Sequence, residues 1–321
     1  MNPTRLLFAG TPAFALASLQ ALVESGIEPV AVLTQPDRRA GRARRLRQSP
    51  VKVYAEARGM PVMQPPTLRD EAARSALQAL APDIMIVAAY GLILPQAVLD
   101  IPRHGCLNVH ASLLPRWRGA APIPAAILAG DRKTGISLMS MTAGLDTGPV
   151  YTSSAVTIGA RETAGELHDR LAVLGGRLLV EHLPAILDGR LTAVAQDDGA
   201  STYAPKIGQD DARLDWREDA TVLARRVRAY NPVPGAWFLV DDLRVKCWRA
   251  EALPDTDAPP GTVLSVSSSA KSSAKDDAIV VACGNGALAM TSLQRPGKKP
   301  VSAREFAAAV EFGGRRLGDS G

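Results

Sequence analysis

Asn108 and His110 stand two residues apart at the end of an apolar stretch, and Asp146 lies between Gly144 and Gly148. Alternate residues of a strand face the same way, so the amide and the imidazole can point into one crevice. Both groups can hydrogen-bond an oxyanion that develops at a carbonyl carbon, and a carboxylate can orient the imidazole and hold its proton. Together these residue types could carry out acyl transfer to an attacking amine, which needs no Ser or Cys nucleophile. The alternative is structural, with ordinary turns at both places.

The elements that must position these side chains follow from an alternation of apolar stretches and helical patterns. We expect strands at 5–10, 29–33, 61–64, 84–89, 105–109, 135–141 and 149–157, and helices at 13–25, 51–58, 69–80, 121–130 and 162–187. Such alternation indicates a parallel sheet covered on both faces. Ligands of these sheets bind outside the carboxyl ends of the strands, where Asn108 and His110 should lie. The turn after the first strand lacks the G-x-G-x-x-G pattern, so a dinucleotide cofactor is not expected.

The last third of the chain has a different pattern. Residues 188–212 show little periodicity, and we place a domain boundary there, with one domain at 1–205 and the other at 206–321. A helix is expected at about 219–230, followed by short strands at 236–240, 243–248, 261–266, 278–283 and 287–293. Short strands separated by Gly-rich turns predict a small barrel. Residues 267–277 are rich in Ser, Ala and Lys and are expected to form a flexible loop within it.

Positive charge is concentrated in one segment. The chain has 321 residues and a net charge of +5, and residues 34–58 hold eight basic and two acidic residues. Six arginines lie between positions 38 and 47. Such a segment cannot bury itself and is expected to be a mobile, exposed loop. Because the planar guanidinium suits phosphate, the loop is a candidate nucleic-acid contact; the alternative is a solvated loop that aids solubility.

Other sequence features bound the class of protein. The three cysteines are far apart, without the spacing of a zinc or redox motif, and their small odd number fits a reducing compartment. The N-terminal apolar stretch is too short for a signal peptide, and no stretch approaches the length of a membrane span. We therefore expect a protein of the bacterial cytoplasm that uses no metal and does not act at a membrane. Because each of the two expected domains looks self-sufficient, we also expect a monomer.

Longer motifs surround these residues and extend over nearly the whole chain. They are FAGTP at 8–12, QPDR at 35–38, SPVK at 49–52, AYGLILP at 89–95, NVHASLLPRWRGAAPI at 108–123, GLDTG at 144–148, RAYNP at 228–232 and GKK at 297–299. Together they resemble the methionyl-tRNA formyltransferases, a branch of the folate-dependent formyltransferases. Asn-x-His with a distant Asp is common to the folate-dependent enzymes, whereas the long SLLPRWRGAAPI motif, the arginine segment and the second domain point to the tRNA branch.

The resemblance implies an α/β fold: a Rossmann-like formyltransferase domain with a mostly parallel sheet, followed by a small C-terminal OB-like β-barrel. It implies transfer of a formyl group from 10-formyltetrahydrofolate to the amine of methionine esterified to initiator tRNA. Asn108 and His110 would stabilise the tetrahedral oxyanion, and Asp146 would pair with His110 and assist proton removal. The folate site would be lined by Ser112, Leu113, Leu114 and Pro115, with the pterin held by backbone around Leu92–Leu94.

The resemblance also implies contacts with the tRNA. The arginine segment would lie at the acceptor end, with Arg42 as the main contact and Arg44 and Arg45 as helpers, while the barrel would hold the tRNA body. Two positions depart from the family pattern. Ala13 stands where an acidic residue is frequent, and Ala111 where Gly is also common. Neither departure removes a chemical group from the expected catalytic residues.

Three other functions remain open at this level. A formyltransferase for a small amine would keep the catalytic residues but needs neither the arginine segment nor the barrel. A hydrolase of the same folate would use water as the acceptor. An RNA-binding protein without catalysis could share the scaffold, although the intact Asn, His and Asp argue against it.

Overall fold

The structure is a computed structural model that describes the chain except for residues 1–3, 41–44, 255, 267–276, 313–315 and 319–321. The chain divides into two compact units. The first unit comprises Met1–Pro122, Lys133–Thr157 and His168–Ala204, and the second comprises Ile123–Arg132, Ile158–Leu167 and Pro205–Gly321. The second unit thus includes two short pieces from earlier in the sequence, besides the C-terminal third of the chain.

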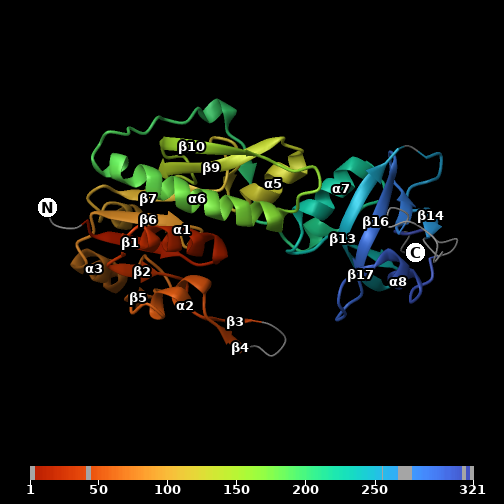
Figure 1. Cartoon of the computed structure of the whole chain (residues 1–321), viewed down its shortest axis with the longest axis horizontal. Coiled ribbons are helices and arrows are strands. Elements are labelled where there is room, and N and C mark those ends of the chain that lie inside the picture. Colours follow the sequence, from red (N-terminus) through yellow and green to blue (C-terminus); the bar gives the residue numbers. More distant parts are fainter. Residues whose placement is uncertain (1–3, 41–44, 255, 267–276, 313–315, 319–321) are drawn as a thin grey trace. The chain divides into compact units, whose positions relative to one another are not determined.

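The described part of the first unit holds a seven-stranded sheet in the order β10-β9-β7-β6-β1-β2-β5 (Figure 1). Five neighbouring strands run parallel, while β9 runs antiparallel to both of its neighbours, β7 and β10, which confirms the mostly parallel sheet. The side chains of β1, β6 and β7 are buried, as expected for continuous apolar strands between two helical layers. The strand bounds are β1 Leu6–Gly10, β2 Ala31–Leu33, β5 Val62–Met63, β6 Ile84–Ala88, β7 Cys106–His110, β9 Lys133–Ser140 and β10 Val150–Thr157.

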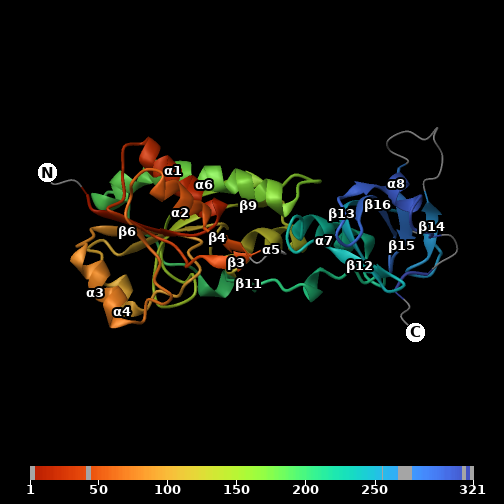
Figure 2. The same cartoon turned by 90° about the horizontal axis from the view of Figure 1, so that it is seen from below.

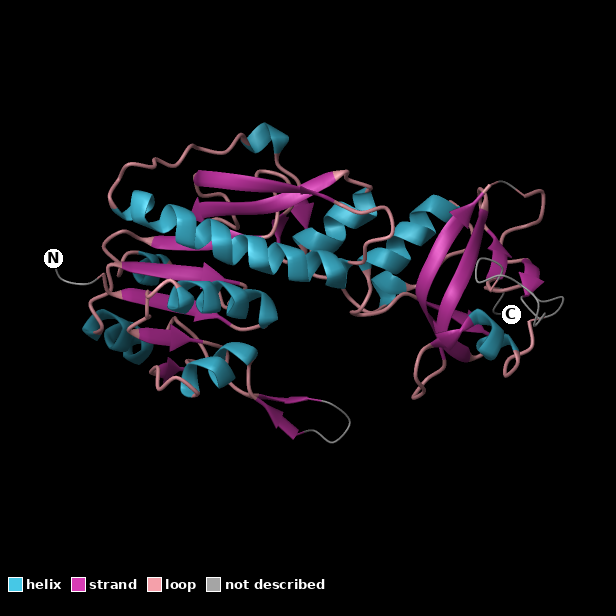
Figure 3. Ribbon diagram, in the orientation of Figure 1, coloured by secondary structure: helices cyan, strands magenta, loops and turns pink. Residues whose placement is uncertain are grey.

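Helices cover the two faces of this sheet, with α1 and α6 on one face and α3 and α4 on the other (Figures 2 and 3). Two adjacent glycines let α6 approach closely. A Cβ on Gly175 would lie 2.9 Å from Val109 Cγ1 on β7, and one on Gly176 would lie 2.9 Å from the backbone oxygen of Ala17 in α1. The helix bounds are α1 Ala13–Glu24, α2 Pro50–Glu56, α3 Glu71–Ala79, α4 Gln96–Leu99 and α6 Ala164–Leu187.

The arginine segment differs from the expected loop. Its ends form a hairpin in which β3 (Arg38–Ala40) pairs antiparallel with β4 (Arg45–Arg47). Exposure was predicted correctly, since Arg38 and Arg47 are exposed and Leu46 is 68% exposed. The strand pairing was missed because a ribbon with water on both faces has no apolar alternation that would indicate it.

The expected boundary region contains a second feature that the sequence pattern did not predict. A short strand, β11 (Tyr203–Ala204), pairs parallel with β8 (Arg118–Gly119), which follows β7 in the chain. The 3₁₀ turn Asp198–Ala200 lies just before it. Residues 188–204 are therefore part of the first unit and contact the loop beyond β7.

The second unit has an antiparallel sheet in the order β12-β13-β16-β15-β14, with β17 paired to β16. All five expected strands are present, but β13 continues to Leu253 instead of ending at 248. In the described part of the chain β12 and β14 form the edges, so the expected barrel is a half-barrel. The bounds are α5 Pro122–Ala129, the 3₁₀ turn Asp210–Ala212, α7 Ala220–Ala229, β12 Trp237–Val240, β13 Leu243–Leu253, β14 Val263–Val266, β15 Ile279–Ala282, β16 Ala287–Gln294, β17 Val301–Ser302 and α8 Ala303–Ala307.

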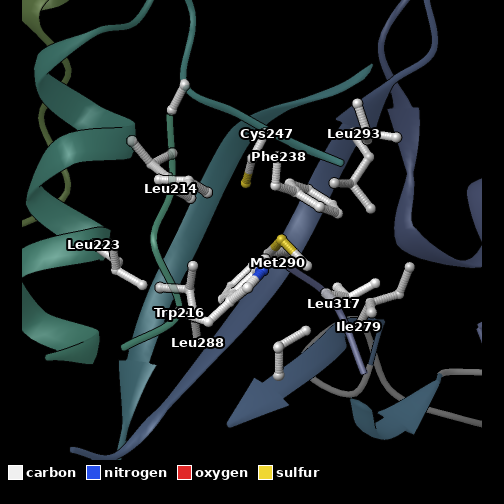
Figure 4. Packing of buried hydrophobic residues seen from close by; sticks show 14 of the residues in the cluster. Leu214, Trp216, Leu223, Phe238, Cys247, Ile279, Leu288, Met290, Leu293 and Leu317 are labelled. Atoms are coloured by element: carbon white, nitrogen blue, oxygen red, sulfur yellow. The ribbon is translucent and has the colours of Figure 1, made fainter. Parts of the chain in front are cut away.

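A separate hydrophobic core holds the second unit together (Figure 4). Trp216 and Phe238 meet edge to face with ring centroids 5.3 Å apart, and Leu223 brings α7 onto the sheet. The expected flexible loop at 267–277 falls almost wholly outside the described residues. Within the described residues, no helix is both long and apolar enough to cross a bilayer.

The three cysteines are free and buried. Burial raises the pKa of Cys106 and of Cys247 to about 12 and that of Cys283 to about 11. Because the thiolate is the reactive form, we expect native protein at about pH 8 to resist alkylation by iodoacetamide. Denatured protein should react at all three thiols, as mass spectrometry would record. Rapid labelling of any of the three in folded protein would contradict this burial.

Candidate active site

The end of β7 places the first two candidate residues. Asn108 pairs with Val87 on β6 and Met139 on β9, and His110 pairs with Ser137 on β9. Because the side-chain period of a strand is two, Asn108 and His110 lie on one face of the sheet. Both side chains are more than nine-tenths buried, so hydrogen bonds made by them are little weakened by solvent.

Asp146 reaches the same place from the loop between β9 and β10. Its φ is 51°, a left-handed conformation that Asp adopts more readily than most residues. The turn also needs Gly148, since a Cβ there would lie 1.7 Å from the backbone oxygen of Ser140. The Gly-Leu-Asp-Thr-Gly motif is therefore a tight turn that presents one carboxylate.

The three side chains come together around this carboxylate. Oδ1 of Asp146 accepts a hydrogen bond of 3.4 Å from Nδ2 of Asn108, and Oδ2 lies 3.7 Å from Nδ1 of His110. The side chain of Asp146 is 15% exposed. The arrangement offers an amide donor, an imidazole and a partly solvated carboxylate within reach of one another, which are the groups that acyl transfer to an amine requires.

The loop after β7 contributes two backbone groups that the sequence patterns did not single out. Nε2 of His110 lies 2.9 Å from the backbone oxygen of Trp117, so this nitrogen carries the hydrogen and Nδ1 faces Asp146. The backbone N–H of Gly119 donates to Oδ2 of Asp146 at 2.8 Å. Trp117 has a φ of 61°. Every residue has a backbone N–H or oxygen, so the residue types at 117 and 119 do not reveal these contacts with His110 and Asp146. Only the long motif around them could have indicated that this loop belongs to the site.

The expected folate segment 112–115 follows directly and is held by its own hydrogen bonds. The hydroxyl of Ser112 is buried and donates to the backbone oxygen of Arg116 at 2.6 Å. The N–H of Leu114 donates to Oγ of Ser137 at 3.1 Å. The side chains of Leu113, Leu114 and Pro115 are partly exposed. The segment therefore has partly exposed apolar side chains, whereas the Ser112 hydroxyl is used within the loop.

The loop after β6 lies at the same edge of the sheet, because β6 and β7 are parallel neighbours. Leu92 and Leu94 belong to the core beneath it, while Ile93 is 76% exposed. Gly91 has a φ of 84°, and the neighbouring oxygen of Tyr90 accepts hydrogen bonds from Thr11 and Gln35. This loop has a firmly held backbone and an exposed apolar side chain.

The expected tRNA contacts are only partly described. Arg42 and Arg44 lie outside the described residues, and Arg45 is described through its backbone pairing in β4. The root of the hairpin is anchored at Asp37, which accepts hydrogen bonds of 2.8 Å from Lys52 and from Gln64. These two hydrogen bonds lower the pKa of the Asp37 carboxyl. The hairpin thus begins from a fixed point beside α2.

No group of three or more His, Cys, Asp and Glu side chains in the described residues is arranged to hold a metal ion.

Comparison with known proteins gives a consistent result for both units. The formyl transferase family model matches residues 4–183, and the model for the formyl transferase C-terminal domain matches residues 206–311. The chain is 50% identical to a methionyl-tRNA formyltransferase from Methylococcus capsulatus over 98% of its length and 99% of the relative. It is 54% identical to one from Ralstonia nicotianae over 94% of each chain.

Solved structures with lower identity share the fold. An N-formyltransferase from Helicobacter canadensis, in complex with folinic acid and dTDP-3-aminofucose, matches with a TM-score of 0.66 at 16% identity, over 89% of this chain and 99% of that one. HypX from Aquifex aeolicus in complex with tetrahydrofolic acid matches with a TM-score of 0.61 at 19% identity, over 95% of this chain and 47% of that one. Both likenesses concern the fold.

Proposed function

The chain belongs to the methionyl-tRNA formyltransferase family, and we propose that Asn108, His110 and Asp146 carry its reaction. That reaction moves the formyl group of 10-formyltetrahydrofolate to the amine of the methionyl moiety of initiator methionyl-tRNA. The observation that carries the proposal is the carboxylate of Asp146, which lies 3.4 Å from Asn108 Nδ2 and 3.7 Å from His110 Nδ1. Asn108 and His110, which can hydrogen-bond an oxyanion, therefore lie within reach of Asp146, which can accept a proton.

In the proposed mechanism the methionyl amine attacks the formyl carbon, and the carbonyl oxygen becomes an oxyanion. The amide of Asn108 and the imidazole of His110 stabilise that charge. The attacking nitrogen loses its proton to Asp146. The new N–C bond is kept as the bond from the formyl carbon to N10 breaks, and N10 takes up a proton. The hydrogen bond from Gly119 N to Asp146 holds the carboxylate in place throughout.

We propose that residues 112–115 and the backbone of Leu92–Leu94 hold the folate. The support is their location at the carboxyl ends of β6 and β7, beside Asn108 and His110. Partly exposed Leu113, Leu114 and Pro115 suit an apolar ring system. Two solved proteins of the same fold contain folinic acid or tetrahydrofolic acid, which makes a folate pocket on this scaffold reasonable.

We propose that the β3–β4 hairpin contacts the acceptor end of the tRNA through Arg42, Arg44 and Arg45. The exposed arginines at its root and the anchoring of Asp37 support this role. In the same proposal residues 1–205 carry folate binding and catalysis, and residues 206–321 bind the tRNA body. The protein acts as a monomer in the bacterial cytoplasm; its relatives are bacterial proteins.

The decisive assay offers labelled 10-formyltetrahydrofolate with methionyl initiator tRNA, uncharged tRNA, free methionine or no acceptor. We expect label on the charged initiator tRNA alone. Label on free methionine would favour a small-amine enzyme, and release of formate without an acceptor would favour a hydrolase. Binding of tRNA without any transfer would indicate an RNA-binding protein.

A further inference from the structure

Residues 194–204, which we name the return segment, join the two backbone loops that surround Asp146. Val194 exchanges backbone hydrogen bonds of 2.8 Å with Val150, just beyond the Asp146 turn. The backbone oxygen of Thr202 accepts a 2.9 Å hydrogen bond from Arg118 N. Its Oγ1 accepts another of 2.9 Å from Trp117 N. The return segment thus contacts both the loop that carries Asp146 and the loop that follows β7.

Gln196 makes the contact nearest to the candidate catalytic residues. Its amide nitrogen donates to the backbone oxygens of Asp146, at 2.9 Å, and of Gly148, at 2.6 Å. Its amide oxygen accepts from Nε of Arg118 at 3.1 Å. Two donors and one acceptor are therefore engaged, a combination that a terminal amide provides and a carboxylate does not.

Arg118 connects Gln196 to the other wall. Its side chain is almost completely buried, and Nη2 also donates to Asp198 at 2.7 Å. Its backbone lies in β8 between Trp117, whose oxygen contacts His110, and Gly119, whose N–H contacts Asp146. A buried guanidinium with fixed partners makes a rigid connection, because a buried charge without partners is strongly destabilising.

The turn that carries Asp146 needs such support. A non-glycine residue at φ 51° is strained and persists only where its surroundings hold it. Among the described residues, the side-chain amide of Gln196 donates to the backbone oxygen of Asp146 and so holds this turn. We propose that Gln196, braced by Arg118, is the positioning residue that sets the orientation of the Asp146 carboxylate for proton transfer; this rests on the proposed role of Asp146.

The test compares Gln196→Leu and Gln196→Glu with the parent protein. Leu removes all three hydrogen bonds, while Glu keeps the size and the Arg118 partner but cannot donate to the two oxygens. A misplacement of about 1 Å costs up to about 100-fold in rate, so we expect both variants to lose about 10- to 100-fold in kcat. The KM values for folate and for methionyl-tRNA should stay within about threefold, since neither substrate is bound by Gln196.

A double-mutant cycle separates positioning from general damage. In an Asp146→Asn background, Gln196→Leu should lower single-turnover transfer by less than about threefold, because the group that it positions is already disabled. Gln78→Leu, the same change at an exposed site in α3, serves as the control and should leave kcat unchanged. Thermal melts show whether each variant is folded.

Two results would overturn the inference: parental kcat in folded Gln196→Glu, or an equal loss from Gln196→Leu in both backgrounds. Failure of the proposed catalytic role has a different signature, because Asp146→Asn would then itself be fully active. If Gln196→Leu does not fold, the kcat of Gln196→Glu and a double-mutant cycle of Gln196→Glu with Asp146→Asn still test whether Gln196 positions Asp146.

Discussion

Asp146→Asn is expected to lower kcat for formyl transfer by about 100- to 10,000-fold, the range in which a positioned general base contributes. Asparagine has the shape of aspartate but neither its negative charge nor its ability to accept a proton from the attacking amine. The hydrogen bond from Gly119 N, 2.8 Å in the parent, can be kept by the amide oxygen, so the turn should remain folded. Single-turnover transfer to methionyl-tRNA measures the effect directly.

The matched control is Asp188→Asn, the same change at an exposed carboxylate in the first unit that pairs with Arg190. It should transfer formyl groups at the parental rate. Binding of methionyl-tRNA by Asp146→Asn should also match the parent, since loss of a proton acceptor changes kcat and not affinity. A fully active Asp146→Asn protein would remove Asp146 from the mechanism, whereas loss of tRNA binding would assign it to the substrate site.

The sequence predicted the position of Asn108 and His110 well because local patterns determine it. An apolar stretch of strand length leads to both residues, and a strand in a parallel sheet ends at the ligand-binding edge. The Gly-Leu-Asp-Thr-Gly turn was also recognisable as a turn. That Asp146 belongs beside His110 came from the family resemblance, because the spacing of two distant segments does not determine their contact.

Features that depend on distant backbone pairing were not predictable from the pattern. The pairing of β8 with β11 joins residues that are about 85 positions apart in a stretch without periodicity. Gln196 lies in that stretch and resembles any surface glutamine in the sequence. Its proposed role rests on the hydrogen bonds that its amide donates to the backbone oxygens of Asp146 and Gly148, and the sequence pattern does not show these bonds. Buried Arg118 was equally hidden, since arginine in a loop is ordinarily solvated.

The arginine hairpin shows the complementary case, where composition predicted exposure and charge but not structure. Like charges repel, yet Arg38 pairs with Arg47 across the two strands because both side chains remain in water. The anchoring of Asp37 by Lys52 and Gln64 fixes the point where the hairpin leaves the sheet. Local composition therefore indicates an exposed, positively charged segment, and tertiary hydrogen bonds determine where it leaves the sheet.

Removal of charge from this hairpin is expected to weaken tRNA use through electrostatics. In an Arg42→Ala/Arg44→Ala double variant, we expect KM for methionyl-tRNA to rise about tenfold or more at about 0.1 M salt. Each lost phosphate contact reduces the slope of log affinity against log salt by about 0.7–0.9, so two contacts should reduce it by about 1.5. Affinity for the folate should not change. The measurement is KM for tRNA across a series of KCl concentrations.

An Arg69→Ala/Arg190→Ala variant removes the same charge from two arginines of the first unit outside the hairpin, and its salt slope should equal that of the parent. The comparison separates contact from net charge, because both variants lower the total charge by two. If the two variants raised KM equally, long-range attraction would explain the effect and the hairpin would lose its assigned role. A change confined to the hairpin variant, with a reduced slope, requires phosphates next to those side chains.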